Sequence, residues 1–135
     1  MSIIVEGLKG EAHMVVSEED TAVMQGSGTV RVLSTPRLLA LMEAAAVAAL
    51  NGSLPGGKTS VGTKVEIEHT AVTPVGMEVF AKAELVESDG RRLVFTVEAY
   101  DAEGTVGRGR HERVLVDESR FMERVEQKSK VIQEA

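Results

Sequence analysis

The sequence has little of several residue types on which common functions depend. Its 135 residues include no cysteine and no tryptophan, and only 3% of them are aromatic. Without cysteine the chain can form no disulfide, no thiolate nucleophile and no cysteine-bound metal site, and this composition fits the cytoplasmic location that we expect. With so few aromatic side chains, stacking of nucleic acid bases is not expected either.

Positive charge and long apolar runs are also scarce. The chain has 15 Lys and Arg residues against 21 Asp and Glu residues, a net charge of −6, whereas binding to phosphate backbones needs clustered positive charge. The amino terminus, MSIIVEGLKGE, carries an acid early and lacks the apolar core of a signal peptide. We therefore predict that neither nucleic acid nor a membrane is a partner. His13, His69 and His111 are not in metal-ligand spacing, so no metal site is expected.

The most informative stretch is Pro36–Leu50, which reads PRLLALMEAAAVAAL. Every residue from Leu38 onward is apolar except Glu43. A helix that is apolar on all sides is a buried helix, and Ser34 and Thr35 can cap its amino end. Because burying an unpaired charge costs several kcal/mol by common estimates, Glu43 requires a partner, a shifted pKa or a water-filled pocket.

Alternation of apolar and polar residues predicts strands on both sides of this helix. Before the helix, at least one of the two apolar runs Ile3–Val5 and Met14–Val16 forms a strand. A helix-start pattern at Ser17–Asp20 begins a short helix. Thr29–Val32 is an extended piece that leads into the long helix. After it, four strands follow, with an Asp-Gly hairpin between the second and the third; they are Val61–Val72, Val79–Leu85, Leu93–Ala99 and Thr105–Val116. Apolar residues at helical spacing predict a terminal helix or tail over residues 118–135.

These elements predict a single α+β domain over residues 1–135, with an antiparallel sheet of about five strands around the long helix. A sheet covers only one side of a helix. Because this helix is apolar on all sides, we predict that a second copy of the chain covers the other side, with the two sheets joined at their edges. The result is a homodimer, or a tetramer built from two dimers.

Two polar residues fall where this arrangement buries them. His69 shares a strand face with Val65 and Ile67, the face that should lie on the helix carrying Glu43. A carboxylate and an imidazole in one apolar space can perform acid–base or water-activating chemistry, or they can form a purely structural pair. Thr35 is either a helix cap or a functional hydroxyl. It lies about 12 Å along the helix from Glu43, so the two can cooperate only through a substrate or across the dimer interface.

Four stretches carry a resemblance to a known family: STPRLLALMEAA, SVGTKVEIEHTAVTPVGMEV, AELVESDGRRLVFTVEAYD and GRGRHERVLV. They resemble the fluoroacetyl-CoA thioesterases, a branch of the hot-dog-fold acyl-CoA thioesterases. The resemblance implies the hot-dog fold, sites at the dimer interface and a catalytic set that falls on Thr35, Glu43 and His69. It implies no cofactor, because coenzyme A is part of the substrate.

The segment Glu18–Ser34 departs from the family pattern, because it contains no aromatic residue where the fluoroacetate-specialised enzyme has an aromatic lid. We therefore predict hydrolysis of short-chain acyl-CoA thioesters to free acid and CoA, without carrying over the fluorinated substrate. Direct attack by water and an acyl-enzyme intermediate both remain open. The alternative is a non-catalytic hot-dog dimer that binds CoA or acyl thioesters. An enoyl-CoA hydratase is disfavoured because its paired Asp/His motif is missing.

A CoA substrate adds two expectations. Gly62 either lets the acyl thioester approach its backbone, with its amide polarising the carbonyl, or marks a strand irregularity. Cations should contact the phosphates, and Arg113 in the HER segment is the first choice, although a solvated charge is the commoner role for any one of them. The other candidates are Lys58, Arg91, Arg92, Arg108 and Arg110. We expect His13 and His111 to be structural or surface residues.

Overall fold

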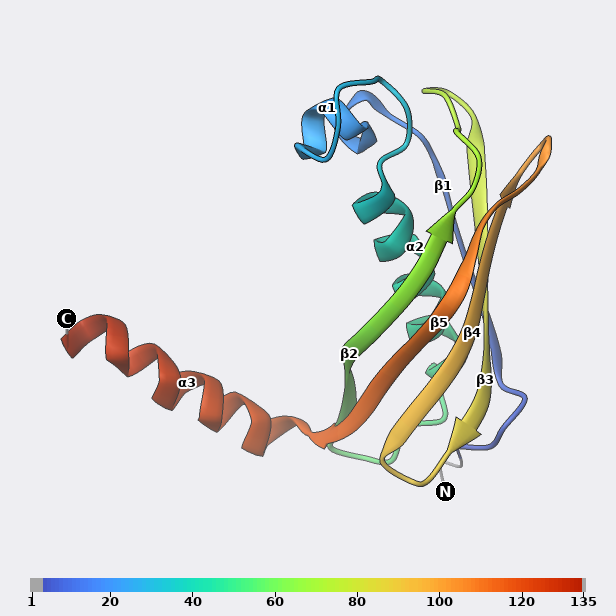
Figure 1. The fold of residues 1–135 in the computed structure, drawn as a ribbon. Coiled ribbons are helices and arrows are strands. Elements are labelled where there is room, and N and C mark those ends of the chain that lie inside the picture. Colours follow the sequence, from blue (N-terminus) through green and yellow to red (C-terminus); the bar gives the residue numbers. More distant parts are fainter. Residues whose placement is uncertain (1–3, 135) are drawn as a thin grey trace.

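A computed structural model describes residues 4–134 and shows a curled antiparallel sheet around one long helix (Figure 1). The order of strands across the sheet is β1-β3-β4-β5-β2, so β1 and β2 are its two edges. The strands are β1 (Lys9–Val15), β2 (Lys58–His69), β3 (Glu78–Ser88), β4 (Arg92–Asp101) and β5 (Gly104–Asp117). The predicted α+β arrangement of one long helix and about five antiparallel strands is therefore confirmed.

Two short helices and one longer helix accompany the central helix. They are η1 (Glu18–Asp20), α1 (Ala22–Gln25) and α3 (Glu118–Glu134), and the central helix is α2 (Thr35–Leu50). The predicted helix start at Ser17 is present, because the Asp20 carboxylate accepts hydrogen bonds from the Ser17 amide and hydroxyl. The extended piece predicted at Thr29–Val32 forms no strand and contributes only an isolated bridge from Val32 to Pro74. Of the first apolar run, Ile3 lies outside the described residues.

The central helix α2 lies between the sheet and open solvent. Ser34 caps its amino end, since its hydroxyl accepts a 3.0 Å hydrogen bond from the Arg37 amide. One face is buried against the sheet and includes Leu38, Leu41, Met42, Ala45, Ala46, Ala49 and Leu50. The opposite face stays exposed in the single chain, and it is formed by Ala40, Ala44, Val47 and Ala48, with Val47 50% exposed. The sheet of one chain thus covers one side of the helix, as predicted.

The edge strand β1 approaches the backbone of α2 at Gly10. A side-chain carbon at this position would overlap the backbone atoms of Ala45 and Ala49. Small residues on both elements therefore bring the strand and the helix into direct backbone contact, which fixes the position of α2 across the sheet.

The terminal helix α3 projects from the end of β5, away from the rest of the domain and past the edge strand β2 (Figure 1). Its apolar side chains remain largely in solvent; Phe121 is 36% exposed and Val125 is 44% exposed. Within residues 4–134, no helix combines the length and the apolar character that a membrane crossing requires.

The Gly10 contact can be tested by substitution. We predict that Gly10→Ala lowers the free energy of unfolding by about 1–3 kcal/mol or more, because the new methyl group overpacks a rigid backbone contact. The control is Gly56→Ala, whose added carbon would meet nothing within 4 Å and should change stability by less than about 0.5 kcal/mol. Urea unfolding of both variants measures the difference; equal stabilities would contradict the close packing.

Candidate active site

The first of two polar clusters joins the amino end of α2 to the carboxyl end of β2. The Thr35 hydroxyl oxygen lies 2.7 Å from Nδ1 of His69. Ser34 performs the capping of the helix, so the hydroxyl of Thr35 is free for this contact. Thr35 is therefore not the cap of α2, and a functional role for its hydroxyl stays a prediction. A hydroxyl within hydrogen-bond reach of an imidazole is the arrangement of a nucleophile and its base.

His69 in this cluster is poised to accept a proton. Burial lowers its pKa below the ordinary value, and the backbone carbonyl of Ala71 only partly opposes that shift. The imidazole is therefore neutral at pH 7. Its second nitrogen, Nε2, is buried and has no hydrogen-bond partner among the described residues. A buried polar atom of this kind normally has a partner, so Nε2 is available to a further group.

The second cluster surrounds Glu43, midway along α2. Its carboxylate oxygen Oε2 lies 3.3 Å from Nη1 of Arg113, which is 9% exposed, whereas the Glu43 side chain is 38% exposed. The guanidinium also donates to the hydroxyl and the carbonyl of Ser60 at 2.9 Å and 3.1 Å. Burial lowers the pKa of Arg113 and the Glu43 carboxylate opposes that shift, but an arginine stays charged at any physiological pH. The partner that Glu43 requires is thus Arg113.

His111 completes the second cluster from a fully buried position, with 1% of its side chain exposed. Its Nδ1 lies 2.9 Å from the Lys64 carbonyl, which can only accept, so Nδ1 carries the proton. Nε2 is then free to accept from Nη1 of Arg113 at 3.1 Å. Burial, with a further contribution from the Arg113 charge, lowers the pKa of His111. A neutral His111 therefore accepts a hydrogen bond from the guanidinium of Arg113, which in turn donates to the Glu43 carboxylate.

Gly62 lies directly beside Glu43 because β2 contains a bulge. Gly62 pairs with Arg113 and Lys64 pairs with Glu112, which leaves Thr63 as the extra residue. The bulge changes the side-chain alternation, so Gly62 faces α2 together with Val65 and His69. A carbon added at Gly62 would lie only 2.5 Å from Oε2 of Glu43. Of the two roles considered for Gly62, the strand irregularity is present, and the approach of an acyl thioester to its backbone stays a prediction.

The two clusters stay apart within one chain. Thr35 and Glu43 are separated by two turns of α2, about 12 Å along its axis, and Glu43 contacts Arg113 while His69 contacts Thr35. The direct meeting of Glu43 and His69 that strand parity suggested does not occur in the single chain. Sequence reasoning also missed His111 as a site residue. It lies two positions before Arg113 on β5, which puts both side chains on one strand face, and that parity was an available signal.

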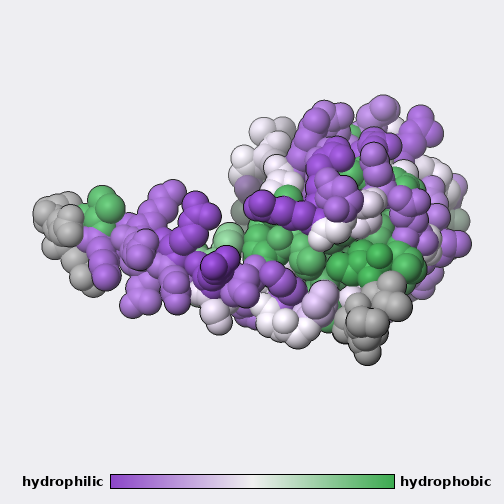
Figure 2. All heavy atoms as spheres, turned by 90° about the horizontal axis from the view of Figure 1, so that it is seen from below, coloured by the Kyte–Doolittle hydropathy of each residue, from purple (hydrophilic) through white to green (hydrophobic). Residues whose placement is uncertain are grey.

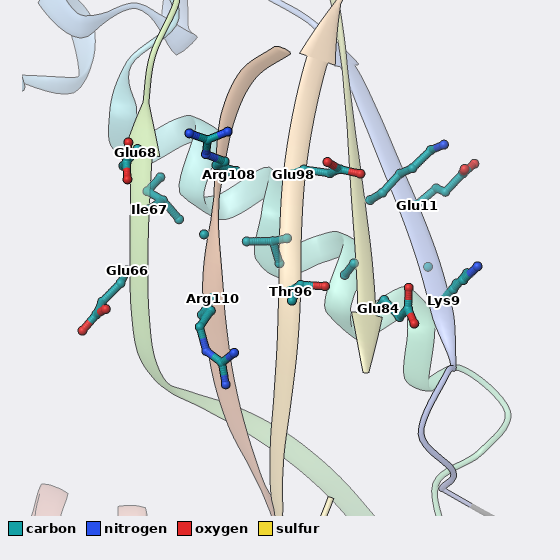
Figure 3. A pocket seen from close by; sticks show the side chains of 15 residues that line it. Lys9, Glu11, Glu66, Ile67, Glu68, Glu84, Thr96, Glu98, Arg108 and Arg110 are labelled. Carbon is teal, nitrogen blue, oxygen red and sulfur yellow. The ribbon is translucent and has the colours of Figure 1, made fainter. Parts of the chain in front are cut away.

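The cations considered for phosphate binding fall into four environments. Arg113 is buried in the Glu43 cluster, and Arg92 is paired with Glu112 at 2.8 Å. Arg108 and Arg110 line a hollow of about 860 Å³ on the sheet face turned away from α2, where Glu66, Glu68 and Glu98 surround them (Figure 3). This hollow contains none of the residues of the two clusters. Lys58 and Arg91 lie near the base of α3.

Comparisons with known proteins agree with this geometry. The profile of the fluoroacetyl-CoA-specific thioesterase family matches residues 16–119. A fluoroacetyl-CoA thioesterase from Streptantibioticus cattleyicolor is 40% identical over 98 residues, which are 73% of this chain and 70% of that protein. A variant of the fluoroacetyl-CoA enzyme FlK in complex with acetyl-CoA superposes with a TM-score of 0.86 at 32% identity, covering 93% of this chain and 98% of its own. A thioesterase superfamily member from Thermus thermophilus superposes with a TM-score of 0.91 at 28% identity over 100% of both chains.

The curled sheet around α2 and these similarities define a hot-dog-fold thioesterase, an enzyme that hydrolyses thioesters. Within that class, the chain belongs to the fluoroacetyl-CoA-specific thioesterase family. The predicted hot-dog fold and the predicted family are therefore confirmed.

The neutral state of His111 makes a prediction about stability and pH. Because its pKa is lowered from 6.5 in the folded protein, the unfolded chain binds a proton below pH 6.5 that the folded chain does not. This contribution to stability is complete above 6.5 and is lost as the pH falls toward the folded pKa. We predict that the free energy of unfolding decreases less between about pH 7.5 and pH 5 in His111→Gln than in the wild type. Urea unfolding across this range measures both slopes, and equal slopes would contradict a neutral, buried His111.

Proposed function

We propose that this thioesterase hydrolyses short-chain acyl-CoA thioesters to the free acid and CoA, in sites that two subunits build together. The observation that carries the proposal is the 2.7 Å contact between the Thr35 hydroxyl and the His69 imidazole at the amino end of α2. A relative of this chain is a fluoroacetyl-CoA thioesterase, and a variant of FlK has been solved with acetyl-CoA, which supports a small acyl group on CoA as the substrate.

In the first half of the reaction, the Thr35 hydroxyl attacks the thioester carbonyl carbon. Nδ1 of His69 takes the hydroxyl proton as the new carbon–oxygen bond forms. The negative charge that develops on the carbonyl oxygen is favoured near the amino end of α2, where the helix dipole is positive. The carbon–sulfur bond then breaks, and the imidazolium of His69 returns the proton to the leaving thiolate. The products of this half-reaction are CoA and an acyl group bound to Thr35.

In the second half, water hydrolyses the acyl-threonine ester. Neutral His69 removes a proton from the water as it attacks, and then protonates the Thr35 oxygen as it leaves. The low pKa of His69 keeps the imidazole unprotonated between the steps. A His69 that remained protonated could not serve as the base in either half-reaction.

We assign Glu43 to the site of the other subunit. Within its own chain Glu43 lies too far along α2 to reach His69, but its side chain is 38% exposed and so remains accessible to a second subunit. The partner's His69 brings a buried Nε2 that needs an acceptor. A hydrogen bond from Nε2 of the partner's His69 to the Glu43 carboxylate would satisfy both groups and orient the base.

The surfaces that a dimer needs are present in the single chain. Ala40, Ala44 and Val47 form an exposed apolar face on α2, and in the view from below apolar surface crosses the domain beside α3 (Figure 2). The outer edge of β2 carries no strand among the described residues, and an open edge strand is a template for pairing. Antiparallel pairing of two β2 edges would bring the first half of one β2, which contains Gly62, beside the second half of the other, which ends at His69. A sedimentation mass equal to one 14.4 kDa chain would contradict this assembly.

We further propose that a fluorinated acyl group is not preferred over an unfluorinated one. The segment before α2 contains η1 and α1 and is tied to the helix by the pair of Asp20 and Arg37 at 3.1 Å. Its apolar side chains, including Val23, Met24 and Val30, are aliphatic or sulfur-containing, and none is aromatic. Nothing in this segment therefore offers an aromatic edge that would favour the C–F bond.

The catalytic assignment predicts the effect of three substitutions. Thr35→Ala, His69→Ala and Glu43→Gln should each lower kcat/KM for acetyl-CoA or propionyl-CoA by roughly 10²–10⁴-fold, because each removes the nucleophile, the base or the group that orients the base. The matched control is Ser34→Ala, which removes the neighbouring hydroxyl and about 1 kcal/mol of helix capping but should retain activity. Release of free thiol from a panel of acyl-CoA esters measures these rates.

Two results, one from the thiol-release assay and one from thermal unfolding, would overturn the assignment. Wild-type rates in the three variants would place the reaction elsewhere in the molecule. Thermal stabilisation of the wild type by CoA esters, without any release of thiol, would instead identify a non-catalytic binding module.

A further inference from the structure

Four cations meet at a cleft between the base of α3 and the ends of β2 and β5. They are Lys58, Arg91, Arg120 and Arg124, and they come from the start of β2, the β3–β4 hairpin and the first turns of α3. The cleft has a volume of about 450 Å³, and its apolar lining consists of Leu115, Val116 and Phe121. Asp117 is the one acidic residue in its lining, and its carboxylate already accepts from the Arg120 amide at 3.1 Å.

In the described part of the chain these four cations have no anionic partner, unlike most arginines of the chain. Elsewhere Arg37, Arg92 and Arg113 each lie within 3.3 Å of a carboxylate oxygen. No ion pair is found for the four cleft cations among residues 4–134. In a chain with a net charge of −6, such a group of unpaired cations around a concave surface creates a local positive potential that attracts anions.

The cleft lies on the same two strands as the Glu43 cluster. Lys58 precedes Gly62 by four residues on β2, about 13 Å at the usual rise of a strand. Leu115 and Val116 follow Arg113 directly along β5, and the register pairs Lys58 with Asp117. A ligand whose reacting end lies beside Gly62 and Glu43 can therefore extend along these strands to the base of α3 (Figure 1).

We propose that this cleft binds the phosphorylated adenosine end of the CoA substrate. The inference rests on the proposed function, because it takes an acyl-CoA as the ligand. CoA carries three phosphates near one adenine ring, which matches several unpaired cations beside an apolar wall. The guanidinium groups of Arg91, Arg120 and Arg124 suit phosphate oxygens because they donate in a planar fork. Phe121, 36% exposed, offers a face on which the adenine can stack.

This assignment also explains where the phosphate contacts expected from the sequence are found. Arg113 is buried and engaged with Glu43 and Ser60, so it orients the carboxylate rather than a phosphate. Arg108 and Arg110 lie on the opposite face of the sheet among carboxylates, where a polyphosphate would be repelled. Lys58 and Arg91 are the expected cations that do line an anion-accepting cleft, and α3 supplies two more.

The experiment compares two substrates with the same thioester. Acetyl-CoA carries the phosphates, whereas the acetyl thioester of N-acetylcysteamine lacks the whole nucleotide. For the double variant Arg120→Ala with Arg124→Ala we expect KM for acetyl-CoA to rise about 10-fold or more, because the phosphates lose two charged hydrogen-bond donors. Its kcat for acetyl-CoA and both constants for the small thioester should stay unchanged. The control variant Arg108→Ala removes a cation from the other sheet face and should leave KM unchanged for both substrates.

Failure of this inference can be distinguished from failure of the proposed function. If the wild type hydrolyses both substrates and the double variant changes KM for both or for neither, the cleft does not bind the nucleotide, while the thioesterase assignment stands. If the wild type hydrolyses neither substrate, the proposed function fails. Calorimetric titration with adenosine 3′,5′-bisphosphate then still tests the cleft: binding that the double variant loses supports it, and no binding by the wild type overturns it.

Discussion

Glu43 is the one ionisable side chain in a helix that is otherwise apolar from Leu38 to Leu50, and the organisation of the site follows from how its charge is satisfied. The carboxylate is held by the buried guanidinium of Arg113, which is held in turn by Ser60 and His111. Removing one partner of such a pair would leave an uncompensated charge at a cost of several kcal/mol. The pair therefore fixes the position of α2 along its axis relative to β2 and β5.

The spacing along α2 then separates the chemistry into two parts. Thr35 at the first turn meets His69, and Glu43 two turns later meets Arg113. A rigid helix cannot bring these groups together, since they are about 12 Å apart along its axis. The exposed apolar face of the same helix supports the proposed second copy of the chain. An apolar helix with polar groups on its first and third turns thus underlies both the proposed assembly and the proposed division of the site.

The two histidines near α2 have different surroundings although burial lowers the pKa of both. Nδ1 of His111 donates to a backbone carbonyl and its Nε2 accepts from Arg113, so its hydrogen-bonding capacity is used within the chain. His69 is only partly buried, and its Nε2 has no partner among residues 4–134. The proposed base is thus the histidine that keeps a nitrogen available, whereas His111 is structural.

Periodicity in the sequence was enough to predict the long helix, the strands after it and the Asp-Gly hairpin, because each of these signals is local. The resemblance to the thioesterase family implied that Thr35 and His69 belong to one catalytic set, and the structure brings the two side chains into contact. The partner of Glu43 could not be predicted from a local pattern, because Arg113 meets Glu43 only once β5 packs beside α2. The closeness of Gly62 to Glu43 depends on the bulge between Gly62 and Lys64, and a bulge depends on pairing with a distant strand. The role of Gly10 was hidden for a similar reason, since its contact with Ala45 and Ala49 exists only once β1 lies across α2.

The division of the site between subunits is tested most directly by mixing two inactive proteins. Thr35→Ala and Glu43→Gln homodimers each lack one group in both sites, but a mixed dimer contains one site in which both groups are intact. After dissociation and reassociation of an equimolar mixture, roughly half of the dimers are mixed, and acetyl-CoA hydrolysis should recover to about a quarter of the wild-type rate. If Thr35 and Glu43 of the same chain formed one site, every site in the mixture would carry a defect. An activity no higher than that of the separate variants would therefore contradict a site shared between two subunits.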